Sequence, residues 1–149
     1  MGTLGSVDAV TTSPTKVAGT QTATRALRIL RSFLVGPPSK TLSEIAREQG
    51  LHKSIAFRLL RALEEQSFVR RDPRTKEYRL GLALIELGEA ARTSLDVRRE
   101  ALPIMADLVR QTGETVFLTV LSGDEAVCVE LVESPSDVKV TYRVGRRHP

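Results

Sequence analysis

The stretch from Leu42 to Gly81 reads LSEIAREQGLHKSIAFRLLRALEEQSFVRRDPRTKEYRLG, and it decides the fold that we expect. Two segments with apolar residues at helical spacing are separated by one tight turn at Gly50. This turn is too short for anything but a sharp crossing of two helices, which is the helix-turn-helix pattern. A basic segment rich in turn-forming residues follows directly.

The first of these helices, predicted over residues 42–49, has signals at both ends. Thr41 and Glu44 match a capping box, in which the hydroxyl and the carboxylate each bind a free backbone N–H group. Gly50 can adopt the left-handed conformation that ends a helix. An earlier helix is predicted between Thr24, a candidate cap, and the stop signal Gly36-Pro37-Pro38.

The second helix of the pair is predicted from about His52 to Gln66. At 100° per residue, its apolar face contains Ala56, Leu59, Leu60 and Leu63. The opposite face contains Ser54, Arg58, Arg61 and Glu65, with Ile55 and Phe57 on the flanks. The helix therefore has one face for a core and one cationic, polar face for solvent or a partner.

The segment FVRRDPRTKEYRL predicts two short strands around the turn Asp72-Pro73-Arg74-Thr75. Three helices followed by a hairpin make a winged helix-turn-helix. After Gly81 the pattern is helical again, first in LALIELGEAARTSL and then in DVRREALPIMADLVRQTG. Asp96 is a candidate cap for the second of these helices and Gly113 its expected end, whereas Pro103 either kinks the helix or lies at a break.

The last part of the chain predicts strands. TVFLTVLSGDEAVCVELVES indicates two strands joined at Gly123-Asp124, and DVKVTYRVG indicates a third. The expected fold class is mainly α with a β wing: a winged helix-turn-helix, a connecting helix, then the first strands of an incomplete α/β domain. The expected divisions are a disordered tail over 1–23, the winged helix-turn-helix over 24–81, the connecting helix over 82–94, and the start of a truncated domain over 95–149.

Charge is unevenly distributed. Residues 25–79 contain 13 Lys and Arg against 6 Asp and Glu, whereas residues 81–149 contain 8 against 11. A basic lobe attracts polyanions without any sequence code, although a solvated arginine-rich surface would have the same composition. No apolar run approaches the roughly 20 residues of a membrane span. Cys128 is a single cysteine within AVCVELV, which favours a buried structural thiol and a reducing cytoplasm.

The sequence offers little support for catalysis. His52 and His148 are far apart, and no Cys/His cluster has metal-ligand spacing. The glycine-rich loops that bind phosphate and the nucleophile-elbow motif are both absent from the sequence. The carboxylates mostly lie beside arginines on helical faces, where solvated ion pairs explain them. We therefore expect no enzyme, no metal and no cofactor.

DNA binding explains the cationic face better. An α-helix with its side chains is about 10–12 Å across, which fits the major groove. Ser54, Arg58 and Arg61 can reach bases or phosphates, and Lys53 adds charge near the free N–H groups of the helix start. The hairpin cations are expected to bind the backbone or minor groove, and they are Arg70, Arg71, Arg74 and Lys76. His52 and Phe57 could contact the backbone, or could equally be ordinary surface and packing residues.

The chain resembles the IclR family of bacterial transcriptional regulators from about Thr24 to Pro149. The similarity is carried by TRALRILRSF, by the pattern GL-K-S---RLL--L, by YRLG at the end of the wing, and by TGETV after the linker helix. The resemblance implies that residues 24–81 are a DNA-binding domain, residues 82–94 a linker helix, and residues 95–149 the start of an α/β effector-binding domain. It also implies dimers or tetramers on operator DNA, regulation that is often repression, and a small-molecule effector. It places Lys53, Ser54, Phe57 and Arg58 at recognition positions and Ser43 at a phosphate contact.

Two residues depart from the family pattern. His52 stands where the family often has Pro, and Ile55 where it often has Thr, so that Ile55 could contact a thymine methyl group. The resemblance also implies that the effector pocket lies beyond Pro149, so its residues are unknown. The alternative that we consider is a winged-helix module that binds protein, or nucleic acid without sequence preference.

Overall fold

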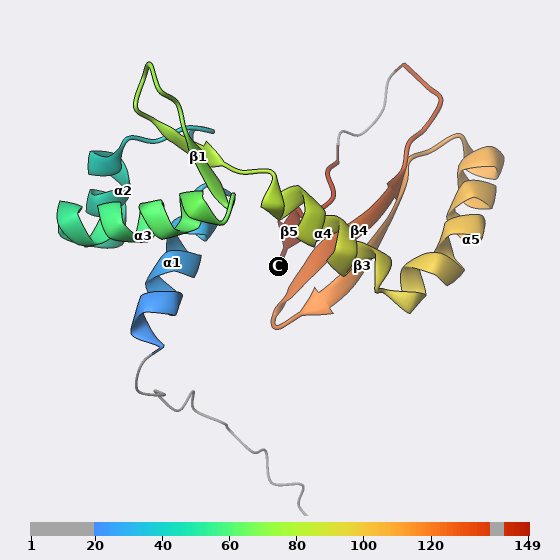
Figure 1. Ribbon diagram of the computed structural model, residues 1–149. Coiled ribbons are helices and arrows are strands. Elements are labelled where there is room, and N and C mark those ends of the chain that lie inside the picture. Colours follow the sequence, from blue (N-terminus) through green and yellow to red (C-terminus); the bar gives the residue numbers. More distant parts are fainter. Residues whose placement is uncertain (1–19, 138–141) are drawn as a thin grey trace, which may run out of the picture. The chain divides into compact units, whose positions relative to one another are not determined.

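The computed structural model describes residues 20–137 and 142–149. The chain divides between Ala83 and Leu84 into two compact units (Figure 1), and each unit is described by itself. The first contains helices α1 (Gln21–Ser32), α2 (Leu42–Gln49) and α3 (Lys53–Glu65), followed by strands β1 (Val69–Arg71) and β2 (Tyr78–Leu80). This order confirms the predicted winged helix-turn-helix.

A single apolar core holds the first unit together. Its buried members are Ile29, Phe33, Ile45, Leu59, Leu60, Val69 and Tyr78. They come from all three helices and both strands, so each helix contributes its apolar stripe to the same core. Full burial of one such side chain stabilises a fold by about 1.5–3 kcal/mol. Ala56 is also buried, whereas Leu63 is only half-buried at the edge of this core.

The predicted capping box at the start of α2 is confirmed. The Thr41 hydroxyl accepts a hydrogen bond from the Glu44 amide at 3.3 Å, and the Glu44 carboxylate accepts one from the Thr41 amide at 2.7 Å. The Thr41 hydroxyl also donates to the Glu44 carboxylate at 2.7 Å, and the two bonds that this carboxylate accepts from Thr41 hold the pKa of Glu44 below its ordinary value. Gly50 ends the helix with φ 62°, in the left-handed region. The sharp turn into α3 is therefore set by local chemistry.

The start of α1 differs from the prediction. Thr20 is the cap residue, and Gln21–Ser32 are helical, so Thr24 lies inside the helix. Its hydroxyl donates to the Thr20 carbonyl oxygen at 3.0 Å, the usual return bond of a helical threonine. No helix breaker stands between Gln21 and Thr24, which lets the helix begin earlier. The remainder of the predicted tail, residues 1–19, lies outside the described residues.

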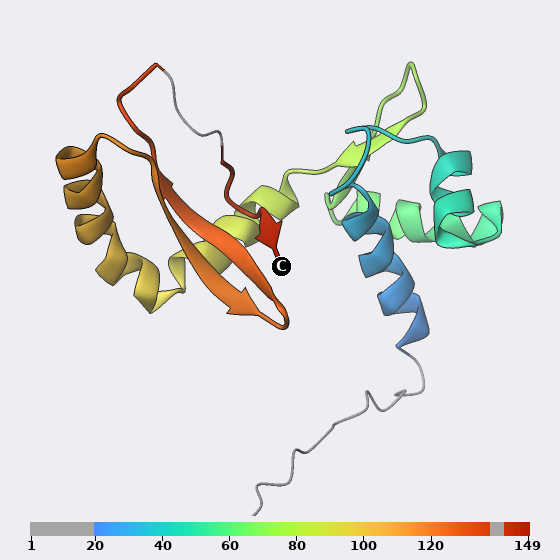
Figure 2. The same ribbon diagram turned by 180° about the vertical axis from the view of Figure 1, so that it is seen from behind.

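The second unit combines two helices with a small sheet (Figure 2). Helices α4 (Ala83–Thr93) and α5 (Asp96–Thr112) precede strands β3 (Val116–Ser122), β4 (Glu125–Val132) and β5 (Arg147–His148). The strands are antiparallel in the order β3-β4-β5. Met105 and Val109 of α5 are buried, and so is Cys128, whose burial raises the pKa of its thiol. The predicted structural thiol is thus confirmed.

Three predictions for the second unit need correction or completion. Leu95 is the cap of α5 and Asp96 its first residue, and the helix continues through Pro103 to its left-handed end at Gly113. The predicted third strand over DVKVTYRVG is wrong over its described part, which is residue 137 and residues 142–145. Gly145 turns the backbone there with φ 86°, so the short strand β5 begins only at Arg147. Residues 138–141 lie outside the described residues.

The part of the chain that the structure describes contains no helix long and apolar enough to cross a membrane.

Candidate nucleic-acid interface

The outer face of α3 carries most of the predicted DNA-binding residues. Lys53, Ser54, Phe57, Arg58 and Arg61 are all exposed. Their orientation is fixed from the other side of the helix, where Ala56, Leu59 and Leu60 are buried in the core. Among the described residues, none forms a hydrogen bond or ion pair with the Arg58 side chain. The exposed face of α3 therefore offers hydrogen-bond donors to solvent or to a partner, from Lys53, Ser54, Arg58 and Arg61.

Two members of the predicted set differ from the others. Ile55 is half-buried and packs against the core, so only part of its side chain is available for a groove contact. Arg61 lies 3.3 Å from the Glu65 carboxylate, with both side chains more than half exposed. Such a pair is weak and screened by solvent, so Arg61 can exchange this partner for a phosphate. Phe57 is 40% exposed and is not among the residues packed against the core.

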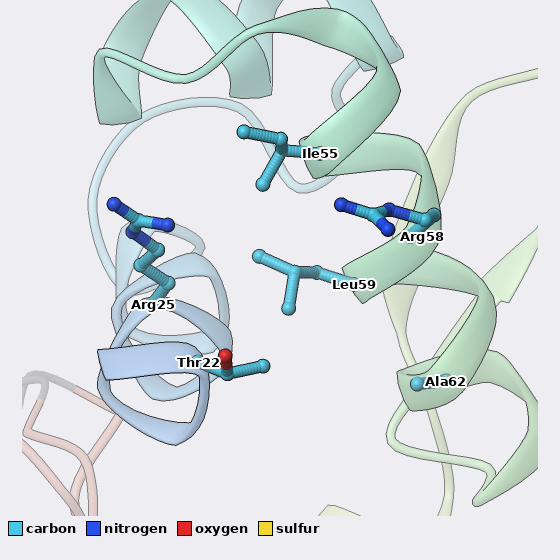
Figure 3. A pocket seen from close by; sticks show the side chains of 6 residues that line it. All are labelled: Thr22, Arg25, Ile55, Arg58, Leu59 and Ala62. Atoms are coloured by element: carbon cyan, nitrogen blue, oxygen red, sulfur yellow. The ribbon is translucent and has the colours of Figure 1, made fainter. Parts of the chain in front are cut away.

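A hollow of about 330 Å³ lies between α1 and α3 (Figure 3). Its floor is apolar, with Ile55, Leu59 and Ala62 on the α3 side. Arg58 extends from α3 toward α1, and Arg25 stands on α1 opposite it (Figure 3). Arg25 was missed in the sequence because the spacing of α1 alone does not show which of its arginines meets α3. It brings a second guanidinium to the edge of α3.

The wing places its cations on a short, well-defined hairpin. The Asp72 carboxylate accepts hydrogen bonds from the amides of Arg74 (2.8 Å) and Thr75 (3.0 Å), which fixes the tip. These two bonds hold the pKa of Asp72 below its ordinary value. Arg70, Arg74 and Lys76 are exposed around this turn.

Arg71 behaves differently from the other wing cations. Its Nε donates to the Lys76 carbonyl oxygen at 3.3 Å, and its guanidinium carbon lies 5.6 Å from the centre of the Tyr78 ring. The side chain is therefore held against the wing itself, so its contribution to a DNA contact competes with these interactions.

The strand register adds one cation that the sequence analysis left out. Arg70 pairs directly with Arg79 across the hairpin, and both are exposed. Like charges opposite each other destabilise an antiparallel pair, and one carboxylate near both arginines, Asp72, leaves the group with a net positive charge. An anionic partner would remove this penalty, so the pair favours a phosphate-binding role for the wing. The sequence did not single out Arg79, because its pairing with Arg70 becomes visible only when the register of the two strands is known.

Ser43 lies in the first turn of α2 and is exposed, next to the Thr41–Glu44 capping box. The free N–H groups and the dipole of a helix start attract phosphate groups. Within the described residues, no group of three or more His, Cys, Asp or Glu side chains could hold a metal ion.

Known families match both units of the chain. The sequence model of the IclR helix-turn-helix domain matches residues 22–73, and that of the C-terminal domain of bacterial transcriptional regulator IclR matches residues 89–149. The chain belongs to the IclR family of bacterial transcriptional regulators.

Individual IclR-family relatives agree with this assignment. The HTH-type transcriptional regulator KipR of Bacillus subtilis is 36% identical over 129 residues, which are 87% of this chain and 51% of KipR. XynR of Escherichia coli is 34% identical over the same shares of the two chains. The crystal structure of an IclR transcriptional regulator from Alicyclobacillus acidocaldarius matches with TM-score 0.72 and 34% identity, covering 86% of this chain and 52% of that one. The chain thus spans about half the length of the relatives it matches.

The second unit of this IclR-family chain has its own hollow, of about 410 Å³. It lies between α4 and β4, beside the turn at Val144 and Gly145, and its lining is mostly apolar, with Leu95, Val127 and Cys128 among the members. The same unit contains a buried carboxylate, Glu130, which joins Arg92 of α4 to Arg98 of α5. Neither feature was anticipated from the sequence, because both depend on how the helices meet the sheet.

Proposed function

We propose that the chain is part of a sequence-specific DNA-binding transcriptional regulator. In this proposal α3 enters the major groove, and the wing binds the DNA backbone. The observation that carries the proposal is the outer face of α3, where Lys53, Ser54 and Arg58 are exposed above a helix locked into the core. A solubilising surface would not require the like-charged pair Arg70–Arg79 on the adjacent hairpin. The IclR membership of the chain supports the same function.

The roles that we propose follow from position and chemistry. Arg58 and Ser54 contact base edges, since both are exposed on α3 and can donate hydrogen bonds to bases. Lys53, Ser43 and Arg61 bind phosphates near helix ends or along the groove, and Phe57 and the exposed part of Ile55 make apolar contacts. The wing cations that we propose as backbone contacts are Arg70, Arg71, Arg74, Lys76 and Arg79. Arg25 adds a phosphate contact from α1.

We further propose a repressor that acts as a homodimer in the bacterial cytoplasm, with tetramers possible for the whole protein. Repression is supported by AllR of Salmonella typhimurium, named a transcriptional repressor and 32% identical over 136 residues. Dimerisation is supported by exposed apolar residues on α1 and on α4, such as Leu27 (61% exposed) and Ile85 (68%). Two recognition helices in a dimer would read half-sites about one DNA turn apart.

A small-molecule effector is part of the proposal for the whole protein. An IclR homolog from Microbacterium hydrocarbonoxydans was crystallised with 4-hydroxybenzoate, and it matches with TM-score 0.71 and 29% identity over 86% of this chain and 53% of that one.

Arg58→Ala tests the assignment of the recognition helix. On a duplex selected from a random pool by the wild-type chain, we expect binding to weaken by about 1–3 kcal/mol and selectivity to relax at one base pair, because a bidentate base contact is lost. Arg99→Ala is the matched control, since it removes the same charge from an exposed site on α5. Unchanged binding by Arg58→Ala, or equal weakening on all sequences, would remove Arg58 from base reading.

A further inference from the structure

Lys40 is a buried cation in the first unit, with only 4% of its side chain exposed. It lies in the connection between α1 and α2 and takes no part in the outer face of α3. We propose that Lys40 is a positioning residue for the wing: it anchors the segment to which the wing pairs and so sets where the wing cations meet DNA. The effect on DNA contacts rests on the proposed DNA-binding function, whereas the anchoring of the wing by Lys40 does not.

The side chain of Lys40 holds two helices. Its Nζ donates to the Ser32 carbonyl oxygen, at the end of α1, at 2.8 Å. The same atom lies 2.6 Å from the Glu48 carboxylate of α2 and 5.7 Å from the centre of the Phe33 ring. A helix C-terminus carries free carbonyls and partial negative charge, which suits a cation at this place. The ammonium group is therefore fixed from several directions inside the helix-turn-helix.

The backbone of Lys40 holds the wing. Its amide donates to the Tyr78 carbonyl oxygen at 3.0 Å, and its carbonyl accepts from the Tyr78 amide at 2.7 Å. Next to it, the Ser39 hydroxyl donates to the Glu77 carboxylate at 2.7 Å. The backbone of Lys40 thus pairs with β2 on the edge that β1 does not occupy, while the side chain of Lys40 contacts α1 and α2. One residue joins α1, α2 and the wing.

The wing needs such an anchor because it is small. Each of its strands has three residues, and an isolated two-stranded hairpin is marginally stable in water. Tyr78 itself is buried, so the contact with Lys40 lies at the base of the wing, below the exposed cations of the tip. Loosening this contact would let the tip move relative to α3 without removing any cation from the surface.

A lysine is also an unusual choice for stability alone. Replacing both members of a buried ion pair with apolar side chains is often neutral for folding, whereas removing one member leaves the other charge without a partner. Here the remaining partner, Glu48, is 37% exposed, so its carboxylate stays in contact with water when Lys40 is replaced. Lys40→Met therefore keeps the bulk of the side chain and removes its two directional bonds. This variant separates a general contribution to folding from a specific hold on the wing.

The first arm of the test needs no DNA. Amide hydrogen exchange is followed by NMR in the wild-type chain, in Lys40→Met and in Glu48→Gln, which keeps the lysine but removes its charged partner. We expect the Tyr78 amide to exchange roughly tenfold faster in Lys40→Met and less so in Glu48→Gln, because local opening of the wing becomes easier. The helical amides of Ile45 and Leu60 should exchange as in the wild type.

The second arm measures DNA binding. Lys40→Met should weaken binding roughly tenfold at about 0.1 M salt if one wing–phosphate contact is lost, since each such contact contributes about 0.9 to the salt slope. Lys40→Met should cost less binding free energy in an Arg74→Ala background than in the wild type, because both changes affect the wing tip. In an Arg58→Ala background it should cost as much as in the wild type, because Arg58 lies on α3 and does not depend on Lys40. Arg110→Met, which removes an exposed charge from α5, is the control for net charge.

Several outcomes would overturn the proposal. Unchanged Tyr78 exchange in Lys40→Met would show that the side chain does not hold the wing. Faster exchange at every core amide would make Lys40 a general stabiliser. Equal losses beside Arg74→Ala and Arg58→Ala would remove the link to the wing contacts. A wild-type chain without preference for any duplex would contradict the proposed function instead, and the exchange arm would still decide whether Lys40 anchors the wing.

Discussion

Glu130→Gln is expected to lower the free energy of unfolding of the second unit by about 3 kcal/mol, because it removes the carboxylate partner of the partly buried Arg98 and leaves Arg92 paired only with the more exposed Glu89. Glu130 lies on β4 and is 7% exposed. One of its carboxylate oxygens accepts from Arg92 Nη1 at 2.7 Å and from Arg98 Nε at 2.5 Å, and the other accepts from the Leu131 amide at 3.0 Å. A single carboxylate thus joins α4 and α5 to the sheet.

Glutamine keeps the shape and most acceptor capacity of the side chain, so the expected loss comes mainly from charge. The matched control is Glu125→Gln on the same strand, where the carboxylate pairs with Arg147 at 2.8 Å in an exposed position. That pair should contribute about 0–1 kcal/mol. Urea denaturation followed by circular dichroism measures both. Equal small effects of the two variants would show that the Glu130 network does not hold the helices.

Gly81→Ala is expected to destabilise the first unit by about 3 kcal/mol, at the upper end of overpacking effects. A Cβ atom at this position would lie 2.0 Å from the Ser67 carbonyl oxygen and 3.0 Å from the Phe68 carbonyl carbon. Both neighbouring atoms belong to the backbone, which cannot rotate away as a side chain can. The same backbone is hydrogen-bonded to the segment around Gly81: the Gly81 amide donates to the Phe68 carbonyl oxygen at 2.8 Å, and the Ala83 amide donates to the Ser67 carbonyl oxygen at 3.3 Å. Relief of the clash therefore breaks the junction at the end of the wing.

Gly88→Ala is the control for this prediction. Gly88 lies inside α4, and a Cβ atom there would meet nothing within 4 Å. The substitution should stabilise the chain by about 0.5–1 kcal/mol, because alanine favours a helix interior over glycine. Thermal unfolding of the two variants beside the wild type makes the comparison. A Gly81→Ala chain as stable as the wild type would show that the backbone at Gly81 can move away from Ser67 and Phe68 at little cost in free energy.

The sequence predicted those parts of the fold whose causes are local. The capping box Thr41–Glu44, the left-handed Gly50 and the apolar stripe of α3 lie within a few residues of one another, so α2 and α3 were predicted nearly to their ends. The earlier start of α1 and the displaced third strand were missed, because helix starts and edge strands depend on weak or distant partners. Gly145 forms a turn with φ 86°, which the alternation of polar and apolar residues in DVKVTYRVG did not indicate.

The candidate interface shows the same division. Helical periodicity was sufficient to place Ser54, Arg58 and Arg61 on the outer face of α3. The roles of Arg25, Lys40 and Arg79 required tertiary information: the approach of α1 to α3, the burial of a single lysine in the loop between α1 and α2, and the register of the hairpin. Lys40 in particular reads as a surface loop residue in the sequence, and only its neighbours in space show that it is buried.

The measurement that tests the central claim most directly is a fluorescence-anisotropy titration at two salt concentrations. The chain is titrated against the DNA immediately upstream of its own gene and against a shuffled duplex of equal composition. A sequence-specific regulator should bind the native duplex more tightly and keep that preference at the higher salt, because base contacts do not depend on counterion release. Equal binding to both duplexes, lost steeply as salt rises, would contradict sequence-specific recognition by this chain.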